Sequence, residues 1–229
     1  FMTTDRINHF LFKDYEEDGP NREAFMDFYR TVDDYVGRIR ELLPEDVTLV
    51  VASDHGFTSL DYEVHCNAWL EEEGWLSFED DDHDDLTDIA EESRAYSLIP
   101  GRFYINLEGR EPRGSVPEAE YEAVRAELKS ALESLEGPEG DEVCERVVEK
   151  EDAFRGEHDD IAPDLVAIPN HGFDLKSGFK SHDDVFDVGP RNGMHSFDNA
   201  TLFVDDPSAS IADADLFVLT DVGLATAIP

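Results

Sequence analysis

Cysteine is scarce in this 229-residue sequence, and long apolar runs are absent. The two cysteines, Cys66 and Cys144, provide neither a disulfide framework nor the spacing of a cysteine metal site, so we expect reduced thiols in the core. No segment approaches the roughly 18 apolar residues of a membrane-spanning helix. We therefore expect a cytoplasmic protein without a membrane partner. Repeats and Gly/Ser-rich linkers are also missing, which favours a single domain over residues 1–229 with a cap-like elaboration over roughly 77–190.

Positively charged residues are also scarce. The chain has 18 Lys and Arg against 56 Asp and Glu, a formal net charge of −38. Such a chain repels a nucleic-acid duplex unless metal ions intervene. The acidic residues are spread along the whole sequence instead of forming a tail. This distribution is typical of a surface that stays hydrated in concentrated salt, where the Debye length falls to about 3 Å. We interpret the chain as a halophile's protein.

The spacing of apolar residues predicts helices that alternate with buried strands. Residues 21–43 and 117–135 show the three- and four-residue intervals of amphipathic helices. Residues 47–52 form a continuous apolar run, which is typical of parallel strands buried on both faces. An α/β fold with a parallel-rich sheet follows. The other expected elements are a helix over 65–76, two strands around a Pro-Gly turn within 96–107, strands at 164–169 and 200–204, and a helix over 220–227.

Three short segments carry the residue types of a metal site. Asp5 and His9 are four residues apart, so on a helical turn they face the same way; the alternative is a surface Asp-His pair. Asp54 and His55 directly follow the 47–52 strand, at the carboxyl end where α/β sheets place ligands. Their alternative role is a strand-to-loop turn capped by the Asp. His195, in Gly193-Met-His-Ser-Phe-Asp198, lies beside another predicted strand and indicates little alone.

These five side chains form a mixed oxygen and nitrogen ligand set. Two Asp and three His suit zinc, or another transition ion such as manganese, better than calcium. Five ligands exceed the number that one tetrahedral site with an open position needs. The set therefore predicts two divalent metal ions.

The ordered motifs Asp-x-x-x-His, strand-Ser-Asp-His-Gly and Gly-x-His resemble those of the type I phosphodiesterase/nucleotide pyrophosphatase branch of the alkaline phosphatase superfamily. The similarity covers essentially the whole chain. Further segments look like stretches of archaeal members of the family: Thr4-Asp-Arg-Ile-Asn-His-Phe10, Pro100-Gly-Arg-Phe-Tyr-Ile-Asn106, Ala162-Pro-Asp-Leu165 and the terminal helix.

The resemblance implies a three-layer α/β/α sandwich with a mostly parallel central sheet and a cap-like insertion. It also assigns the candidate ligands to two ions. Asp5, His9 and His195 are implied to hold one metal, and Asp54 and His55 to contribute to the second.

The family completes the second site with an upstream Asp and a Thr or Ser nucleophile. Only four residues precede Asp5, and Thr3 and Thr4 are too close to it to be that nucleophile. We therefore expect the nucleophile upstream of Phe1, so that no catalytic residue is assigned within the chain. On this interpretation the chain corresponds to the C-terminal portion of such an enzyme.

The implied activity is metal-dependent hydrolysis of phosphodiester or nucleotide pyrophosphate bonds in a small phosphorylated substrate. Arg102, His171 and His182 are candidate substrate-binding residues, although an Arg in such a turn more often pairs with carboxylates. The same ligand layout serves phosphomonoesterases, sulfatases and phosphoglycerate mutase-like enzymes. A catalytically incompetent metal-binding fragment, or a subunit that needs a second polypeptide, is the non-enzymatic alternative. The oligomeric state is not indicated.

Overall fold

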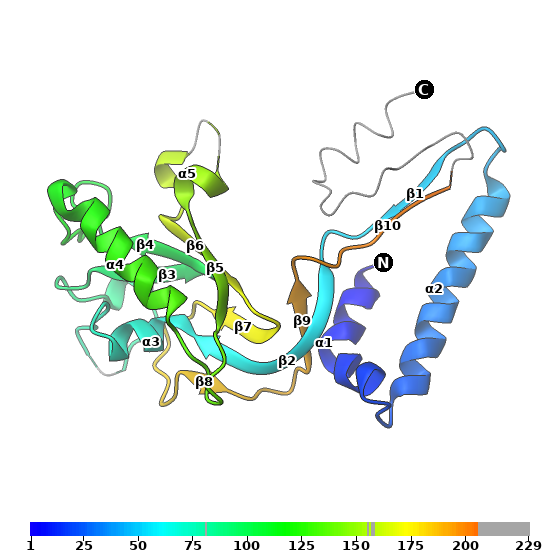
Figure 1. Ribbon diagram of the computed structural model, residues 1–229, viewed down its shortest axis with the longest axis horizontal. Helices are drawn as coiled ribbons and strands as arrows, with labels where there is room; N and C mark the ends of the chain where they lie inside the picture. The colour runs from blue at the N-terminus through cyan, green and yellow to red at the C-terminus, as the bar shows by residue number, and fades with distance from the viewer. Residues whose placement is uncertain (81, 155, 157–158, 206–229) are drawn as a thin grey trace. The chain divides into compact units, whose positions relative to one another are not determined.

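The computed structural model describes residues 1–80, 82–154, 156 and 159–205, which fall into two compact units (Figure 1). The first unit comprises residues 1–60 and the described residues from 190 onward; the second comprises residues 61–189. Strand β2 (Gly56–His65) belongs to both, because its first residues pair within the first unit and its last residues within the second. The cap-like insertion expected over roughly 77–190 stays a prediction.

Two helices and two short sheet pairings make up the first unit. Helix α1 (Met2–Glu16) is followed by α2 (Arg22–Leu42), which confirms the helix predicted over 21–43. Strand β1 (Leu49–Ala52) pairs antiparallel with β10 (Leu202–Asp205). The first half of β2 pairs antiparallel with β9 (Gly193–Ser196). Because α1 contacts both α2 and β9, residues that are far apart in the sequence meet in this unit.

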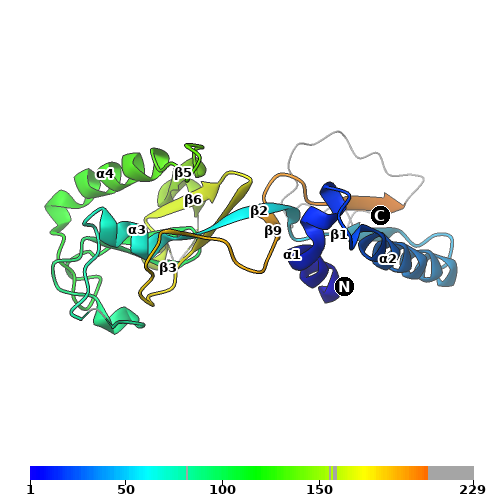
Figure 2. The ribbon, with the colours of Figure 1, turned by 90° about the horizontal axis from the view of Figure 1, so that it is seen from below.

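The second unit holds the main apolar core around a four-stranded sheet. Its strand order is β3 (Ala95–Ile99), β4 (Arg102–Ile105), β6 (Leu165–Pro169) and β5 (Cys144–Glu149), all paired antiparallel. Helix α4 (Tyr121–Glu133) packs along one face of this sheet (Figure 2). The other elements among the described residues of this unit are α3 (Cys66–Glu72), α5 (Lys150–Ala153), β7 (Gly172–Lys176), β8 (Phe186–Asp187) and 3₁₀ turns at Leu86–Asp88, Glu118–Glu120 and Asp159–Ile161.

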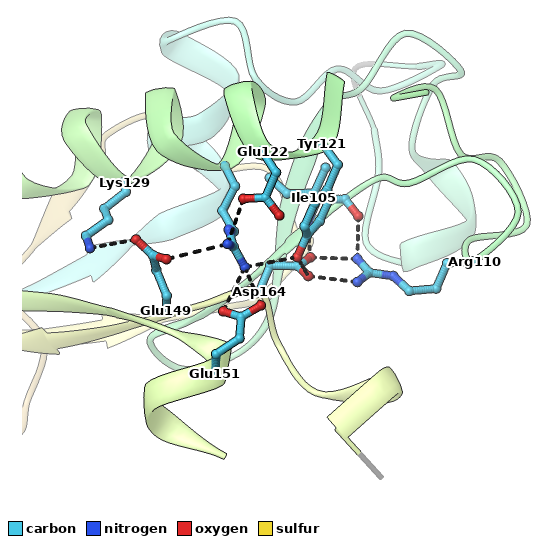
Figure 3. Close-up of polar contacts among 9 residues, drawn as sticks. Ile105, Arg110, Tyr121, Glu122, Lys129, Glu149, Glu151 and Asp164 are labelled. Carbon is cyan, nitrogen blue, oxygen red and sulfur yellow. Dashed lines mark hydrogen bonds and ion pairs between the residues drawn. The ribbon is translucent and has the colours of Figure 1, made fainter. Parts of the chain in front are cut away.

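The buried carboxylate of Asp164 connects strand β4 to Arg110 and to helix α4 through hydrogen bonds (Figure 3). Asp164 has no exposed surface. It accepts hydrogen bonds from the Ile105 backbone N–H at 2.7 Å and from the Tyr121 hydroxyl at 2.6 Å. The Arg110 guanidinium donates to both carboxylate oxygens, at 2.8 and 2.6 Å. Since both oxygens of Asp164 have hydrogen-bond partners, its burial is compensated and its role is structural.

The prediction of a mixed α/β fold is confirmed, whereas that of a mostly parallel sheet is not. The strands expected at 47–52 and 200–204 are present as β1 and β10, but they run antiparallel to each other. A continuous apolar run does not fix strand direction, and β1 is only partly buried. A three-layer sandwich is not evident in the described residues, and the helix predicted over 220–227 lies outside them. No helix among the described residues is both long and apolar enough to cross a bilayer.

Candidate metal centre

Helix α1 is held beside β9 by two hydrogen bonds with Asn192, the residue that immediately precedes the strand. The Asn192 backbone N–H donates to the His9 carbonyl at 2.8 Å, and the Phe12 backbone N–H donates to Asn192 Oδ1 at 3.0 Å. Gly193 makes this approach possible, because a Cβ there would collide with the Asn8 carbonyl oxygen and the Phe12 Cβ. The helix therefore presents Asp5 and His9 directly beside β9.

The β2–β9 ladder brings His195 beside the Asp54-His55 segment. Phe57 in β2 is the register partner of His195 in β9. His55 immediately precedes β2, and its ring stacks on that of His195 with centroids 3.7 Å apart. The ladder thus joins two segments that are 140 positions apart in the sequence, from 55 to 195.

The Asp5 carboxylate lies among the three imidazoles. Its Oδ1 is 3.0 Å from His195 Nε2, 3.6 Å from His9 Nε2 and 4.0 Å from His55 Nε2. Asp54 Oδ1 approaches the same His55 nitrogen at 3.6 Å, and its side chain is 79% exposed. All five predicted ligands therefore converge on one region of the first unit.

Backbone carbonyls orient two of the imidazoles. His9 Nδ1 lies 2.9 Å from the Gly193 carbonyl oxygen, and His55 Nδ1 lies 3.0 Å from the Gly56 carbonyl oxygen. A carbonyl only accepts hydrogen bonds, so Nδ1 must carry the proton in each ring. The neutral form then keeps a free lone pair on Nε2, which faces Asp5. This arrangement is the usual one for a metal-binding histidine.

The electrostatics of His195 favour its neutral form. Burial lowers its pKa, and the neighbouring His55 lowers it further, whereas the hydrogen bond to Asp5 acts in the opposite direction. Neutral imidazole is the form that binds metals. One donor atom each from Asp5, His55 and His195 lie within 4.8 Å of one another, so a single cation fits between them. The donor set and its geometry are compatible with a transition-metal site.

Two residues that support the cluster were given no role by the sequence analysis. Phe57 is 8% exposed, and its ring lies 5.0 Å from that of His9 and 5.2 Å from that of His195. Asn199 donates to the Phe57 carbonyl at 2.9 Å and fills the space where a Cβ of residue 56 would lie. Phe57 directly follows the Asp-His-Gly motif, but its packing against the imidazoles depends on the β2–β9 register. The contact of Asn199 with β2 depends on strand pairing as well, so the sequence around these two residues gives no local signal for either role.

A cavity of about 860 Å³ adjoins the cluster within the first unit. Asp5, Asp54 and His55 form part of its wall, and Tyr15 and Tyr29 contribute aromatic surface. Tyr29 donates to Asn8 Oδ1 at 2.9 Å, which holds its ring in place. The volume falls within the range of small-molecule sites in proteins, about 300–1,000 Å³.

Phe1 and Thr4 line the same cavity. The sequence analysis expects the nucleophile upstream of Phe1. The side chain of Phe1 is largely exposed, so it is not part of the apolar core. The Thr4 hydroxyl donates to the Phe1 carbonyl at 2.5 Å, within the first turn of α1. This contact gives Thr4 a local structural role and does not indicate a nucleophile. A nucleophile upstream of Phe1 is tested by none of the described residues, and its assignment stays a prediction.

The three candidate substrate-binding residues lie in the second unit. Arg102 is partly buried and donates to the Pro100 carbonyl at 2.8 Å. His182 is exposed and stacks on His65 with ring centroids 3.5 Å apart; His171 is also exposed. His65 Nε2 is buried and has no hydrogen-bond partner among the described residues. None of the three has a contact that indicates a ligand, so their assignment stays a prediction.

A scan against protein families matches residues 1–198 to type I phosphodiesterase / nucleotide pyrophosphatase. The chain belongs to this family. Family membership makes it a phosphoric ester hydrolase, in a family that is typically metal-dependent. No curated protein and no solved structure gave a significant match.

Proposed function

We propose that the protein hydrolyses phosphodiester or nucleotide pyrophosphate bonds in a small substrate, using a pair of divalent metal ions bound by the Asp5 cluster. The observation that carries this proposal is the convergence of two carboxylates and three imidazoles from segments around residues 5, 54 and 195. A surface Asp-His pair or a capped turn does not require the three segments to meet.

In this proposal Asp5, His9 and His195 hold one ion, and Asp54 and His55 contribute to the other. Asp5 Oδ1 lies almost as close to His55 as to His9, so this carboxylate would be available to either ion. Zinc fits the mixed donor set, and manganese is the second choice. The orientation of His9 and His55 by backbone carbonyls supports the assignment, because no ring rotation is needed for binding.

When bound, such ions lower the pKa of a hydroxyl or water nucleophile and neutralise the phosphoryl oxygens. The chain's own residues position those charges and exclude part of the solvent. Phe57 packs beneath the imidazoles and keeps water from that side. The partial burial of His9 and His55, whose side chains are 17% and 27% exposed, strengthens electrostatic interactions at the cluster.

The adjoining cavity is the proposed position of the substrate. It shares Asp5, Asp54 and His55 with the cluster, so a phosphoryl group at that wall lies next to the proposed ions. The net charge of −38 opposes binding of an anion, and local cations overcome this repulsion. The substrate is therefore expected to bind only together with the metal.

The test is hydrolysis of bis(p-nitrophenyl) phosphate by the full-length gene product, after chelation and again after addition of zinc or manganese. Activity that is lost with the metal and restored by it is the expected result. Faster hydrolysis of p-nitrophenyl phosphate or p-nitrophenyl sulfate would instead assign the monoesterase or sulfatase alternative. An active Asp5→Asn/His195→Ala variant would contradict the proposed site.

A further inference from the structure

A second concave site lies entirely within the second unit and is lined by residues from the ends of α3 and α4 and from the segment that enters β8. Figure 1 labels these three elements. Its volume is about 680 Å³, within the range of small-molecule sites. Trp69, Leu135 and Val185 supply an apolar floor, and each is less than 10% exposed. We refer to this site as the α3–α4 groove.

The rim of the α3–α4 groove is acidic. Glu72, Glu73, Glu136 and Asp184 all line it and are exposed. Among the described residues, none of these four side chains has a hydrogen bond or an ion pair. No Lys or Arg is among the described residues that line the groove, and two cations of this unit pair elsewhere: Arg125 with Glu122 and Glu151, and Arg94 with Glu127. The rim charge is therefore uncompensated.

The backbone adds further negative potential at the same place. Helix α3 ends at Glu72 and α4 ends at Glu133, and the groove is lined by residues of both ends. The C-terminus of a helix carries a partial negative charge, which basic residues in the last turn usually offset. Neither helix has a basic residue in its last turn. This contribution comes from the peptide dipoles and is independent of the rim carboxylates.

We propose that the α3–α4 groove binds a small organic cation that has an apolar, preferably aromatic, body. The apolar floor takes the body, and Trp69 and Phe186 offer aromatic surface next to the positive group. The acidic rim and the two helix ends attract the charge and disfavour anions, including the phosphorylated substrate of the metal centre. The site is separate from that centre and does not depend on the hydrolase assignment.

The probe pair for this site is 2-phenylethylammonium and 2-phenylethanol, which share an apolar body and differ in charge. Titrations use the full chain at a constant salt concentration at which circular dichroism shows it folded. The expected result is at least fivefold tighter binding of the ammonium compound, with the indole N–H resonance of Trp69 shifting during the titration. Equal affinity for both compounds, or no binding of either, would overturn the proposal.

A charge-matched pair of variants separates the groove from the general field of the protein. Glu72→Gln/Glu73→Gln removes two rim charges, whereas Glu91→Gln/Glu92→Gln removes two exposed charges of the same unit that do not line the groove. The rim variant should weaken ammonium binding at least fivefold and the control less than twofold. Equal losses would refute a specific site. Much tighter binding of a Lys-Phe-Lys peptide than of the amine would also refute it, in favour of a protein partner.

Discussion

Gly193 controls how closely α1 approaches β9, and with it the position of Asp5 and His9. We predict that Gly193→Ala destabilises the first unit by roughly 1–3 kcal/mol, because the new Cβ meets the Asn8 backbone and the Phe12 Cβ, neither of which can move without the helix. It should also weaken metal binding at least tenfold. Thermal melts and metal titration measure the two effects.

Gly37 in α2 is the matched control for this change. Nothing lies within 4 Å of a Cβ built there. Gly37→Ala is therefore expected to leave metal binding unchanged and to stabilise the helix by up to about 1 kcal/mol. If the two glycine variants behave alike, close packing of α1 on β9 is not what forms the cluster.

Asp164 gives a second prediction at the residue scale. Asp164→Ala removes the acceptor of the Ile105 N–H and the buried carboxylate that pairs with Arg110, which keeps only Glu111 and the Ile105 carbonyl as acceptors. It should cost about 3–5 kcal/mol of unfolding free energy. Glu122→Ala removes a partner of Arg125 that is 75% exposed, so a loss below about 1 kcal/mol is expected. Denaturant titration compares the two. Similar losses of unfolding free energy in the two variants would show that burial of the carboxylate does not determine the cost of removing it.

The candidate ligands could be named from the sequence, but their supporting residues could not. Asp5, His9, Asp54, His55 and His195 stand in short motifs whose residue types already indicate metal chemistry. The packing of Phe57 under the imidazoles depends on the β2–β9 register, and the contact of Asn199 with β2 depends on the same pairing. Such long-range pairing leaves no local pattern for a single sequence to reveal.

At the scale of elements, amphipathic helices were predictable and short strands less so. The predictions for 21–43 and 117–135 correspond to α2 and to the Glu118–Glu120 turn with α4, because apolar spacing and Pro or Gly ends are local signals. The sequence analysis did not predict strand β2. Exposed and buried positions are mixed along this strand, and its partners β8 and β9 lie far away in the sequence.

The starts of α3 and β5 carry the two cysteines, which are free and buried as predicted. Burial raises the pKa of Cys66 and of Cys144 to about 12, from an ordinary value of 9.0. Because the folded pKa is the higher, the thiols favour folding fully below pH 9, and this contribution is lost as the pH rises from about 9 to 12.

Alkylation by iodoacetamide at about pH 9 tests this expectation. Both thiols should react roughly 100-fold or more slowly in the folded chain than in denaturant, because few thiolates form and access is restricted. The stability measured at the same salt concentration should decline above that pH. Rapid labelling of either cysteine in the folded protein would contradict its place in the core.

At the scale of the whole molecule, the net charge of −38 implies strong self-repulsion at low ionic strength. We propose that the protein is adapted to concentrated salt, and we expect its melting temperature to rise by on the order of 10 °C or more from dilute buffer to molar KCl. A melt in sucrose separates charge screening from solvent exclusion. Equal melting temperatures in dilute buffer and KCl would reject the halophilic interpretation.

The account depends most on the claim that the three separated segments form one metal centre. Calorimetric titration of the metal-free chain with zinc tests it directly, using His195→Ala and, as control, His171→Ala, an exposed histidine of the second unit. The account predicts up to two ions per chain, loss of most of the affinity in His195→Ala, and unchanged binding in His171→Ala. Unaltered zinc binding by His195→Ala would contradict it.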